Sequence, residues 1–385
     1  MFNPRIDRRK LITLATVAFL AACKVVPNGN VPPPPHPPEQ PNANVLPTDS
    51  QRHRIALLVP LSGPNGAAGQ AIANASTMAL LDTSAQNLRI TTYDTSTGAA
   101  AAAAKAISDG NKLILGPLMS EDIPLVSAAA RPARVPVISY SNDEMRAARD
   151  TLIMGSLPSE SVNRTVAYAR SQGISRFAAL IPAGAYGQRN SAALVSAVRA
   201  QGGTLAAMES YDRSLTAIAQ AARRLRDKGG YEAVLIADGG RMSAQAAPVL
   251  KAGGNNGIRL LGSELWSGES VVTASPAMAG AWYSAISDSR WRQFSDSYRN
   301  RFGTPPYRIA TLGYDSVLLT LRVAREWRPG TVFPTPRLFD PDGFLGLDGA
   351  FRFRSNGAIQ RALEVRQVRA GGGDVVSPAP GKFVN

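Results

Sequence analysis

Cysteine and histidine are almost missing from this 385-residue sequence, which holds one cysteine and two histidines. A single cysteine excludes an internal disulfide bond. Two histidines leave little for metal binding or for acid–base catalysis. His36 lies inside a proline run and His53 lies just before the first expected strand, so we expect neither to be positioned for catalysis. We therefore expect no metal, no cofactor and no enzymatic activity.

Acidic residues are also scarce: the sequence has 28 Asp and Glu against 42 Lys and Arg, which gives a formal net charge of +14. Removal of residues 1–22 would leave about +11. Such a charge favours anionic partners. The basic residues are scattered over many segments, and no nucleic-acid-binding motif accompanies them. We therefore expect no nucleic acid as a partner.

No apolar run of the sequence is long enough to span a membrane. The longest follows four basic residues near the N-terminus and covers residues 11–22. A membrane-spanning helix needs about 20 apolar residues, whereas about twelve are typical of the apolar part of a signal peptide. Residues 1–22 are therefore interpreted as a signal peptide. Arg8 and Arg9 match a twin-arginine export signal only in part, so the general and the twin-arginine routes both stay open.

The single cysteine, Cys23, stands where this apolar run ends. Leu20-Ala21-Ala22-Cys23 resembles the lipobox of bacterial lipoproteins, in which small residues precede a cysteine whose sulfur receives diacylglycerol. The resemblance implies lipidation of Cys23, with acyl chains such as palmitate, and attachment to a membrane. A buried core cysteine is the alternative, and the charged segment before it and the prolines after it disfavour that alternative.

A proline-rich segment follows Cys23. Residues 24–52 hold nine prolines and almost no apolar residue that could anchor a core. Such a composition favours polyproline II, which rises about 3.1 Å per residue, so the segment could extend to about 90 Å. Residues 23–52 are interpreted as the lipidated cysteine and a tether. Recognition of the prolines by a partner protein is the alternative.

From residue 54 onward, short apolar runs alternate with alanine-rich stretches suited to helix. The first runs are RIALLVP, RITTYD, KLILG and VPVIS, and a second series follows residue 142 as TLIMG, SRFAALIP, TLAAMES, YEAVLIAD and IRLLG. Repeated strand and helix predict a parallel sheet with helices on both faces. The expected fold class is α/β with two doubly wound, Rossmann-like lobes. Near the C-terminus, AFRFR and ALEVRQV flank Ser355-Asn356-Gly357 and predict a β-hairpin.

Polar residues that follow the expected strands are the candidate site residues. In open α/β sheets the ligand crevice forms outside the carboxyl ends of the strands. The residues at such ends are Ser62, Ser120, Ser139, Ser141, Asp143, Tyr186, Asp238 and Glu264. They include no histidine, cysteine or lysine, so they can bind a ligand but offer no activated nucleophile.

Several segments in their expected order resemble one family. IALLVPLSGPNGAAGQ, LILGPLMSEDIPLVSAAA, AGAYGQRNSAALV and LGYDSVLL resemble type I periplasmic binding proteins of the leucine-binding kind, over about residues 54–369. The resemblance implies two lobes joined by hinge crossovers. We expect the N-terminal lobe to comprise residues 53–143 and 263–335, the C-terminal lobe residues 144–262 and 336–371, and residues 372–385 to be a flexible tail.

Within that family, the lipobox and the long tether resemble the penicillin-binding protein activators. Those lipoproteins sit in the outer membrane and stimulate peptidoglycan synthases by protein contact. The resemblance implies a periplasmic protein, anchored by Cys23 to the inner leaflet of the outer membrane, whose partner is a bifunctional penicillin-binding protein. Lys24 is compatible with that location, because an aspartate there often signals retention in the inner membrane.

The alternative is a solute-binding protein that delivers an amino acid or a related small molecule to an ABC transporter or a receptor. Ser120 matches the family position that grips a ligand carboxylate, Tyr186 the aromatic residue that closes over the ligand, and Glu264 the acid that pairs with its ammonium group. A fourth position departs from the pattern, since Asp143 lies where binders commonly carry a threonine. An aspartate there would repel a carboxylate at a cost on the order of 1 kcal/mol. Tyr140, in place of a proline, could fill space that a ligand needs.

Simpler structural roles compete with binding at Ser120, at Asp143 and at the glycine-rich segment 63–69. Ser120 could cap a helix, and Asp143 could begin one, where carboxylates favour the helix dipole. The glycines of residues 63–69 have the spacing G-x-x-G-x-x-G, which differs from a dinucleotide loop and favours a plain strand-to-helix turn.

Overall fold

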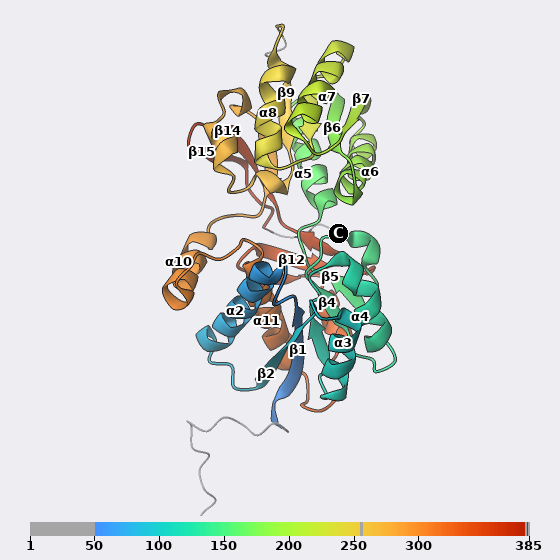
Figure 1. The fold of residues 1–385 in the computed structure, drawn as a ribbon, viewed down its shortest axis with the longest axis vertical. Coiled ribbons are helices and arrows are strands. Elements are labelled where there is room, and N and C mark those ends of the chain that lie inside the picture. Colours follow the sequence, from blue (N-terminus) through green and yellow to red (C-terminus); the bar gives the residue numbers. More distant parts are fainter. Residues whose placement is uncertain (1–50, 255–256, 382, 384–385) are drawn as a thin grey trace, which may run out of the picture. The chain divides into compact units, whose positions relative to one another are not determined.

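The computed structural model describes residues 51–254, 257–381 and 383. The expected signal peptide, Cys23 and nearly all of the expected tether lie outside these residues. No helix in the described ranges is both long enough and apolar enough to cross a membrane. The described residues form two lobes, each built on its own sheet (Figure 1).

The first lobe is built on a parallel sheet of five strands in the order β2-β1-β3-β4-β5. Its strands are β1 His53–Val59, β2 Leu88–Asp94, β3 Leu113–Leu115, β4 Val137–Ser139 and β5 Thr151–Ile153. Successive side chains of a strand point to opposite faces of a sheet. In β1, Leu57 therefore packs in one apolar core and Leu58 in another, and both are buried. A strand buried on both faces explains the continuous apolar run of this segment.

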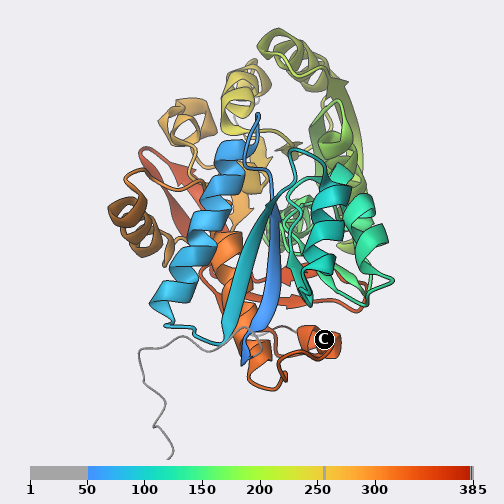
Figure 2. The same ribbon diagram turned by 60° about the horizontal axis from the view of Figure 1, so that its bottom comes forward.

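Helices cover both faces of the first sheet. The helices of this lobe are α2 Gly66–Asp82, α3 Ala99–Ser108, α4 Ile123–Ala130, α10 Trp291–Phe302 and α11 Ala310–Ala324, with short 3-10 helices at η2 Ser120–Asp122, η3 Glu144–Arg146 and η6 Thr335–Phe339. Helix α10 packs on α2 and not on the sheet itself. Helices α3 and α4 cover one face. Helices α2 and α11 lie side by side on the other face (Figure 2). Segments far apart in the sequence therefore complete this lobe.

The second lobe has a seven-stranded sheet in the order β15-β14-β10-β9-β8-β6-β7. Its strands are β6 Arg176–Pro182, β7 Thr204–Tyr211, β8 Ala233–Ile236, β9 Arg259–Gly262, β10 Trp282–Ala285, β14 Glu364–Arg369 and β15 Gly372–Ser377. Strands β6, β7, β8, β9 and β10 are parallel to one another, and β14 runs antiparallel to both of its neighbours, β10 and β15. The prediction of two doubly wound α/β lobes is confirmed.

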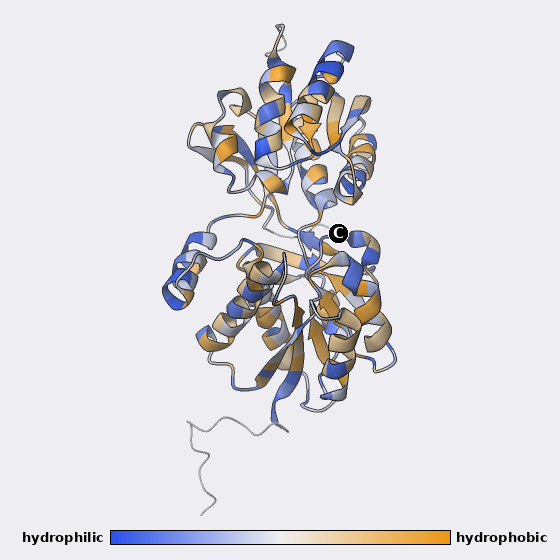
Figure 3. Cartoon of the chain, viewed as in Figure 1, coloured by the Kyte–Doolittle hydropathy of each residue, from blue (hydrophilic) through white to orange (hydrophobic). Residues whose placement is uncertain are grey.

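Helices cover both faces of the second sheet as well. They are α5 Pro158–Ser171, α6 Ala185–Ala200, α7 Leu215–Lys228, α8 Gly240–Lys251 and α9 Ser270–Ala274, with 3-10 helices η4 Glu264–Trp266 and η5 Pro276–Met278. Helices α5 and α6 bury their apolar sides in one core, and α7 and α8 in the other. In Figure 3 apolar residues concentrate on the inner elements of each lobe, and the outer helix surfaces are polar.

A third, antiparallel sheet packs against the first lobe. It consists of β11 Phe344–Gly346, β12 Gly349–Phe353 and β13 Ile359–Arg361. The side chains of Phe344, Phe351 and Ile359 join the core of the first lobe. The expected hairpin around Ser355-Asn356-Gly357 therefore exists, but its second strand is β13. The segment that we expected there begins after β13, and its residues 364–369 form β14 of the second lobe.

The chain crosses between the lobes three times, after β5, after β10 and after β13. The lobe boundaries differ from the expected ones at four places. Strand β5 pairs with β4 in the first sheet, where we expected the second lobe. Residues 263–285, which we expected in the first lobe, continue the second lobe as far as β10. Residues 336–361, which we expected in the second lobe, pack on the first lobe. Residues 372–377, expected as a flexible tail, form edge strand β15. Short strands with similar composition choose partners by long-range pairing, which composition does not specify.

Candidate functional site

A cleft cavity of about 620 Å³ is lined by residues from both lobes. Its first-lobe side includes Asn65, Ala68, Leu118, Met119, Ser120, Glu121, Tyr140, Ser141 and Asn142, and its second-lobe side includes Ser156, Glu264, Leu265, Ser267 and Glu269. Ligand pockets typically measure about 300–1,000 Å³. The described lining residues include no histidine, cysteine or lysine. The cleft therefore presents hydroxyl, amide and carboxylate groups suited to binding.

Three of the eight predicted site residues line this cavity, namely Ser120, Ser141 and Glu264. Ser139 is buried, and its hydroxyl donates to the carbonyl oxygen of Pro117 at 2.8 Å. Ser62 is exposed and its hydroxyl lies 2.7 Å from that of Ser96. Neither Ser62 nor Ser139 lines the cavity.

Ser120 does not cap a helix. It is the first residue of η2, and its hydroxyl donates to Oδ2 of Asp143 at 2.6 Å. Asp143 is buried, and its other oxygen accepts from the backbone N–H of Met145 as the cap of η3. Asp143 therefore lies at the start of a helix, as the structural alternative predicts. Its carboxylate also accepts the proton of the Ser120 hydroxyl, the group that we expected to bind a ligand carboxylate.

Two guanidinium groups lie near the Asp143 carboxylate. Arg146 is 3.7 Å away on the same short helix, and Arg189 approaches to 3.9 Å from α6 of the second lobe. Arg189 also donates to the side-chain oxygen of Asn142 at 3.3 Å. Arg189 was not predicted, because it lies in the second turn of a helix, away from any strand end. It links the second lobe to the loop that carries Asp143.

Glu264 and Tyr186 form the second-lobe part of the site. The hydroxyl of Tyr186 lies 3.0 Å from Oε1 of Glu264 and 3.0 Å from the hydroxyl of Ser263. Oε2 of Glu264 is buried and has no hydrogen-bond partner among the described residues. Burial raises the pKa of Glu264 above its ordinary value. A buried carboxylate oxygen without a donor is costly, and a cationic donor from a ligand would remove that cost.

Close packing at the start of α6 positions Tyr186. A Cβ on Gly187 would lie 1.7 Å from the carbonyl oxygen of Pro182, so only glycine lets the helix start this close to β6. The first lobe repeats the arrangement, since a Cβ on Gly69 would lie 1.8 Å from the carbonyl oxygen of Pro60. The glycine spacing of residues 63–69 thus serves strand-to-helix packing.

Asp238 and Tyr140 have structural partners. Asp238 is buried, accepts from the hydroxyl of Tyr211 at 2.8 Å, and pairs with Arg213 at 2.8 Å. It does not line the cavity. Tyr140 borders the cavity but is buried, and its hydroxyl lies 2.9 Å from that of Ser316 on α11. Tyr140 therefore packs into the first-lobe core and at the same time forms part of the cavity wall.

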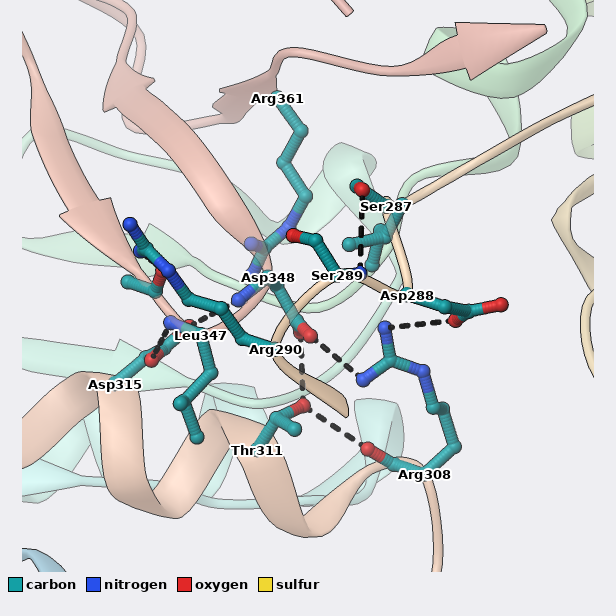
Figure 4. Close-up of polar contacts among 12 residues, drawn as sticks. Ser287, Asp288, Ser289, Arg290, Arg308, Thr311, Asp315, Leu347, Asp348 and Arg361 are labelled. Carbon is teal, nitrogen blue, oxygen red and sulfur yellow. Dashed lines mark hydrogen bonds and ion pairs between the residues drawn. The ribbon is translucent and has the colours of Figure 1, made fainter. Parts of the chain in front are cut away.

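A charged cluster that sequence analysis missed borders the cavity near the second crossover (Figure 4). Nη1 of Arg308 lies 2.7 Å from Oδ1 of Asp348, and the hydroxyl of Thr311 donates to Oδ2 of Asp348 at 2.8 Å. Arg308 also approaches Asp288 of the crossover to 3.9 Å. These residues come from the start of α11, from a turn between β11 and β12, and from the crossover. Reasoning from strand ends could not find them.

Asp315 and Arg361 lie behind this cluster and are buried. Asp315 accepts from the backbone N–H groups of Leu347 at 2.6 Å and Asp348 at 3.3 Å. Burial, together with the nearby Asp348 carboxylate, raises the pKa of Asp315 to about 7. Arg361 donates to the carbonyl oxygen of Met154 at 2.8 Å, and burial lowers its pKa. Arg361 thereby ties the end of β13 to the first crossover.

No group of three or more metal-ligating side chains lies together within the described ranges.

Comparison with known proteins gives a family match and many matches of fold. A family model described as "Periplasmic binding protein" matches residues 53–373. An uncharacterized protein of Rickettsia prowazekii is 28% identical over 173 residues, which are 44% of this chain and 46% of that protein. This chain therefore spans under half the length of that curated relative.

Three solved structures show the same fold. A putative branched-chain amino acid ABC transporter protein of Rhodospirillum rubrum is 19% identical with a TM-score of 0.75, and the match covers 84% of this chain and 100% of that one. A leucine-binding protein of Thermotoga maritima is 16% identical with a TM-score of 0.64, covering 86% and 99%. A solute-binding protein of Rhodopseudomonas palustris, in complex with 3,4-dihydroxybenzoic acid, is 17% identical with a TM-score of 0.65, covering 86% and 97%. At such identity the fold alone is shared.

Proposed function

The chain belongs to the periplasmic binding protein family, and on that basis we propose that it binds a small solute with an ammonium group in the cleft between its lobes. The family implies a periplasmic location, and its members are typically solute-binding proteins without enzymatic activity. The similar structures named for leucine and for branched-chain amino acids support an amino acid or a related amine as the solute. Such a protein would pass its ligand to an ABC transporter or a receptor.

The observation that carries this proposal is the buried Oε2 of Glu264, which has no donor among the described residues. Glu264 lines the cleft together with Ser120 and Ser141 of the other lobe. An ammonium group between them would donate to Glu264 in a charge-assisted hydrogen bond. Because both lobes contribute, ligand binding would favour contact between the lobes.

Calorimetric titration tests the role of the ammonium group. A thermal-shift panel of the standard amino acids first selects the ligand, and its amide and N-acetyl derivatives are then compared. We expect the amide to bind, since it keeps the ammonium group, and the N-acetyl derivative to lose binding. Glu264→Gln should weaken binding about ten- to a hundredfold, because the charge-assisted bond is lost.

Glu269→Gln is the matched control, because it removes the same charge from an exposed position that also lines the cavity. We expect less than about a twofold effect there, as is usual for exposed charges. Equal binding of the N-acetyl derivative, or no stabilisation by any amino acid or amide, contradicts the proposal.

Activation of a penicillin-binding protein by contact is the second candidate. The comparisons support the solute-binding alternative better than this main interpretation of the sequence. One observation favours it: the Ser120 hydroxyl, which resembles the carboxylate-gripping position of the amino-acid binders, is already bonded to Asp143. A cleft weakened for amino acids fits a module that acts by protein contact.

The two candidates differ in their partner. Activation predicts that the chain retains a bifunctional penicillin-binding protein from solubilised membranes and speeds glycan polymerisation by the purified synthase. Solute binding predicts neither effect, and predicts heat on titration with the selected amine. If the chain has no effect on any purified synthase, the activation hypothesis is rejected.

We also propose that Cys23, which lies outside the described residues, is lipidated and anchors the chain to the outer membrane. The lipobox-like residues 20–23 and the proline-rich tether support this. Cys23→Ser should leave the domain folded, abolish labelling by radioactive palmitate and release the protein into the soluble periplasmic fraction. Retention of the variant in the outer-membrane fraction contradicts the proposal.

A further inference from the structure

A second cavity of about 620 Å³ lies wholly in the first lobe. Its lining residues are Arg149, Thr335, Pro336, Phe339, Pro341, Arg352, Phe353, Arg354 and Ser355. They come from the loop before β5, from η6 and the loop after it, and from the end of β12 with its turn. None of them lines the cleft described above. The second cavity is therefore separate from the proposed solute site.

Apolar rings and guanidinium groups line this cavity, and none of its described lining residues is acidic. Phe339, Phe353 and two prolines provide an apolar wall, and three arginines provide positive charge. Guanidinium groups pair with carboxylates and sulfonates in a planar, two-bonded geometry. The lining therefore complements a molecule with an apolar body and an anionic end.

The arginines differ in how far the protein already uses them. Arg354 pairs with Glu160 of α5. Arg352 donates to the side-chain oxygen of Gln360 at 2.8 Å and lies over the ring of Phe383. Arg149 is exposed and makes no ion pair within the described ranges. Arg149 is thus the guanidinium most available to a ligand.

Two acids next to the lining residues in the sequence have other partners. Asp150, next to Arg149 in the sequence, pairs with Arg131 at 2.6 Å. Asp340, at the end of η6, pairs with Arg322 at 3.1 Å. Among the described residues, no acid pairs with Arg149, so the cavity lining keeps this positive charge.

We propose that this cavity binds a small organic anion with an aromatic or aliphatic body, its anionic group held by Arg149 and its body packed against Phe339 and Phe353. The size suits a ligand of that kind, because pockets for small molecules typically measure about 300–1,000 Å³. The proposal is independent of solute binding in the cleft, since the two cavities share no residue.

A pair of fluorescent probes tests the charge requirement. 8-Anilinonaphthalene-1-sulfonate is an apolar anion, and N-phenyl-1-naphthylamine is its uncharged relative. We expect the sulfonate to bind the full chain, and Arg149→Ala to weaken that binding about five- to tenfold, which corresponds to loss of one charge-assisted contact. Arg149→Lys should restore most of the affinity, and binding of the uncharged probe should not change.

Two further variants locate the binding. Arg199→Ala removes an equally exposed arginine from α6 of the other lobe and should leave the sulfonate affinity unchanged. Ser355→Trp places a large ring in the cavity and should abolish sulfonate binding. The thermal midpoint of this variant, and its affinity for the ligand of the cleft, should stay as in the parent protein. Sulfonate binding that survives Ser355→Trp in the folded protein, or that is equal in Arg149→Ala and the parent, overturns the proposal.

Discussion

At the scale of single residues, the proposed solute binding implies that the Ser120–Asp143 hydrogen bond limits which solutes the cleft accepts. Ser120 faces the cavity, but its proton is directed at Asp143. Arg146 and Arg189 offset part of the Asp143 charge from 3.7 and 3.9 Å. A ligand carboxylate would therefore meet a serine that has no free donor and a negative charge directly behind it. This favours amines without a carboxylate over free amino acids.

Asp143→Asn tests this conclusion. Asparagine can still accept from the backbone N–H of Met145, but it removes the charge behind Ser120. We expect a free amino acid to bind about three- to tenfold more tightly to the variant, and its amide to bind as before, because only the carboxylate is repelled. Calorimetric titration measures both. Asp212→Asn, at an exposed loop position, is the control and should change neither affinity. An unchanged ratio of the two affinities in Asp143→Asn contradicts the conclusion.

Asp315 makes the stability of the fold depend on pH. Its pKa is about 7 in the folded chain, against an ordinary value of 3.8. Between about pH 4 and pH 7 the folded chain keeps a proton that the unfolded chain has lost. The folded state then binds more protons, so the free energy of unfolding decreases as the pH rises through this range.

Urea unfolding at several pH values between 4 and 8 measures this dependence. Asp315→Asn cannot titrate, so the decrease between about pH 4 and 7 should be smaller in the variant than in the parent. Asp212→Asn removes a carboxylate from an exposed loop position and is the control, which should keep the slope of the parent. Parallel curves for the parent and Asp315→Asn would mean that Asp315 does not titrate in this range.

At the scale of secondary-structure elements, the contact of α2 with α11 depends on a close approach at Gly313. A Cβ there would lie 2.3 Å from the carbonyl oxygen of Ile72 and 2.8 Å from the hydroxyl of Ser76. Backbone cannot give way as a flexible side chain can. The two helices therefore pack closely because this position has no side chain.

Gly313→Ala should destabilise the first lobe by about 1–3 kcal/mol, since an overpacked helix contact must separate. In an exposed helix, replacing glycine by alanine normally stabilises the helix by about 1 kcal/mol. A destabilising effect of Gly313→Ala would therefore identify the packing contact as its cause. Chemical unfolding measures the change. Gly257→Ala, at an exposed turn with open space around the glycine, should alter the stability by less than about 0.5 kcal/mol. Equal stability of Gly313→Ala and the parent contradicts this account.

The alternating strands and helices, and hence the two doubly wound lobes, could be predicted from sequence because buried parallel strands are continuous apolar runs. The partners of late, short strands could not. Residues 344–361 alternate like strands, but only the burial of Phe344 and Phe351 against α11 and its neighbours assigns them to the first lobe. Ser120, Ser141 and Glu264 could be placed in the cleft because they follow strands. Arg308 and Asp348 could not, since a loop and a turn bring them there.

At the scale of the whole molecule, the lobes are joined by three crossovers, and arginine side chains contact each crossover. Arg361 of the first lobe donates to Met154 at the first crossover, and Arg164 of the second lobe donates to Leu363 at the third. Arg366 of β14 pairs with Asp288 at the second. Charged contacts therefore accompany each chain passage between the lobes.

Ligand in the cleft should stabilise both lobes together. A ligand bound only by the folded chain adds about 2.7 kcal/mol of stability at a concentration of 100 times its Kd. We expect the thermal midpoint to rise with the concentration of the selected amine. At the same concentration, Glu264→Gln should retain only about 0.4–1.4 kcal/mol of this stabilisation, because its affinity is about ten- to a hundredfold weaker. Differential scanning calorimetry measures this. A midpoint that rises equally in the variant would locate the binding outside the cleft.

The path of the chain also sets the order in which its parts can be finished during synthesis. Helix α2 forms early in the sequence but packs on α11, and Tyr140 bonds to Ser316, which lies 176 residues further on. The second sheet receives β14 and β15 only from residues 364–377. Neither lobe can reach its final packing until almost the whole chain has been made. Contacts between such distant segments form slowly. The nascent chain therefore stays incompletely packed until the last strands of the second sheet have been synthesised.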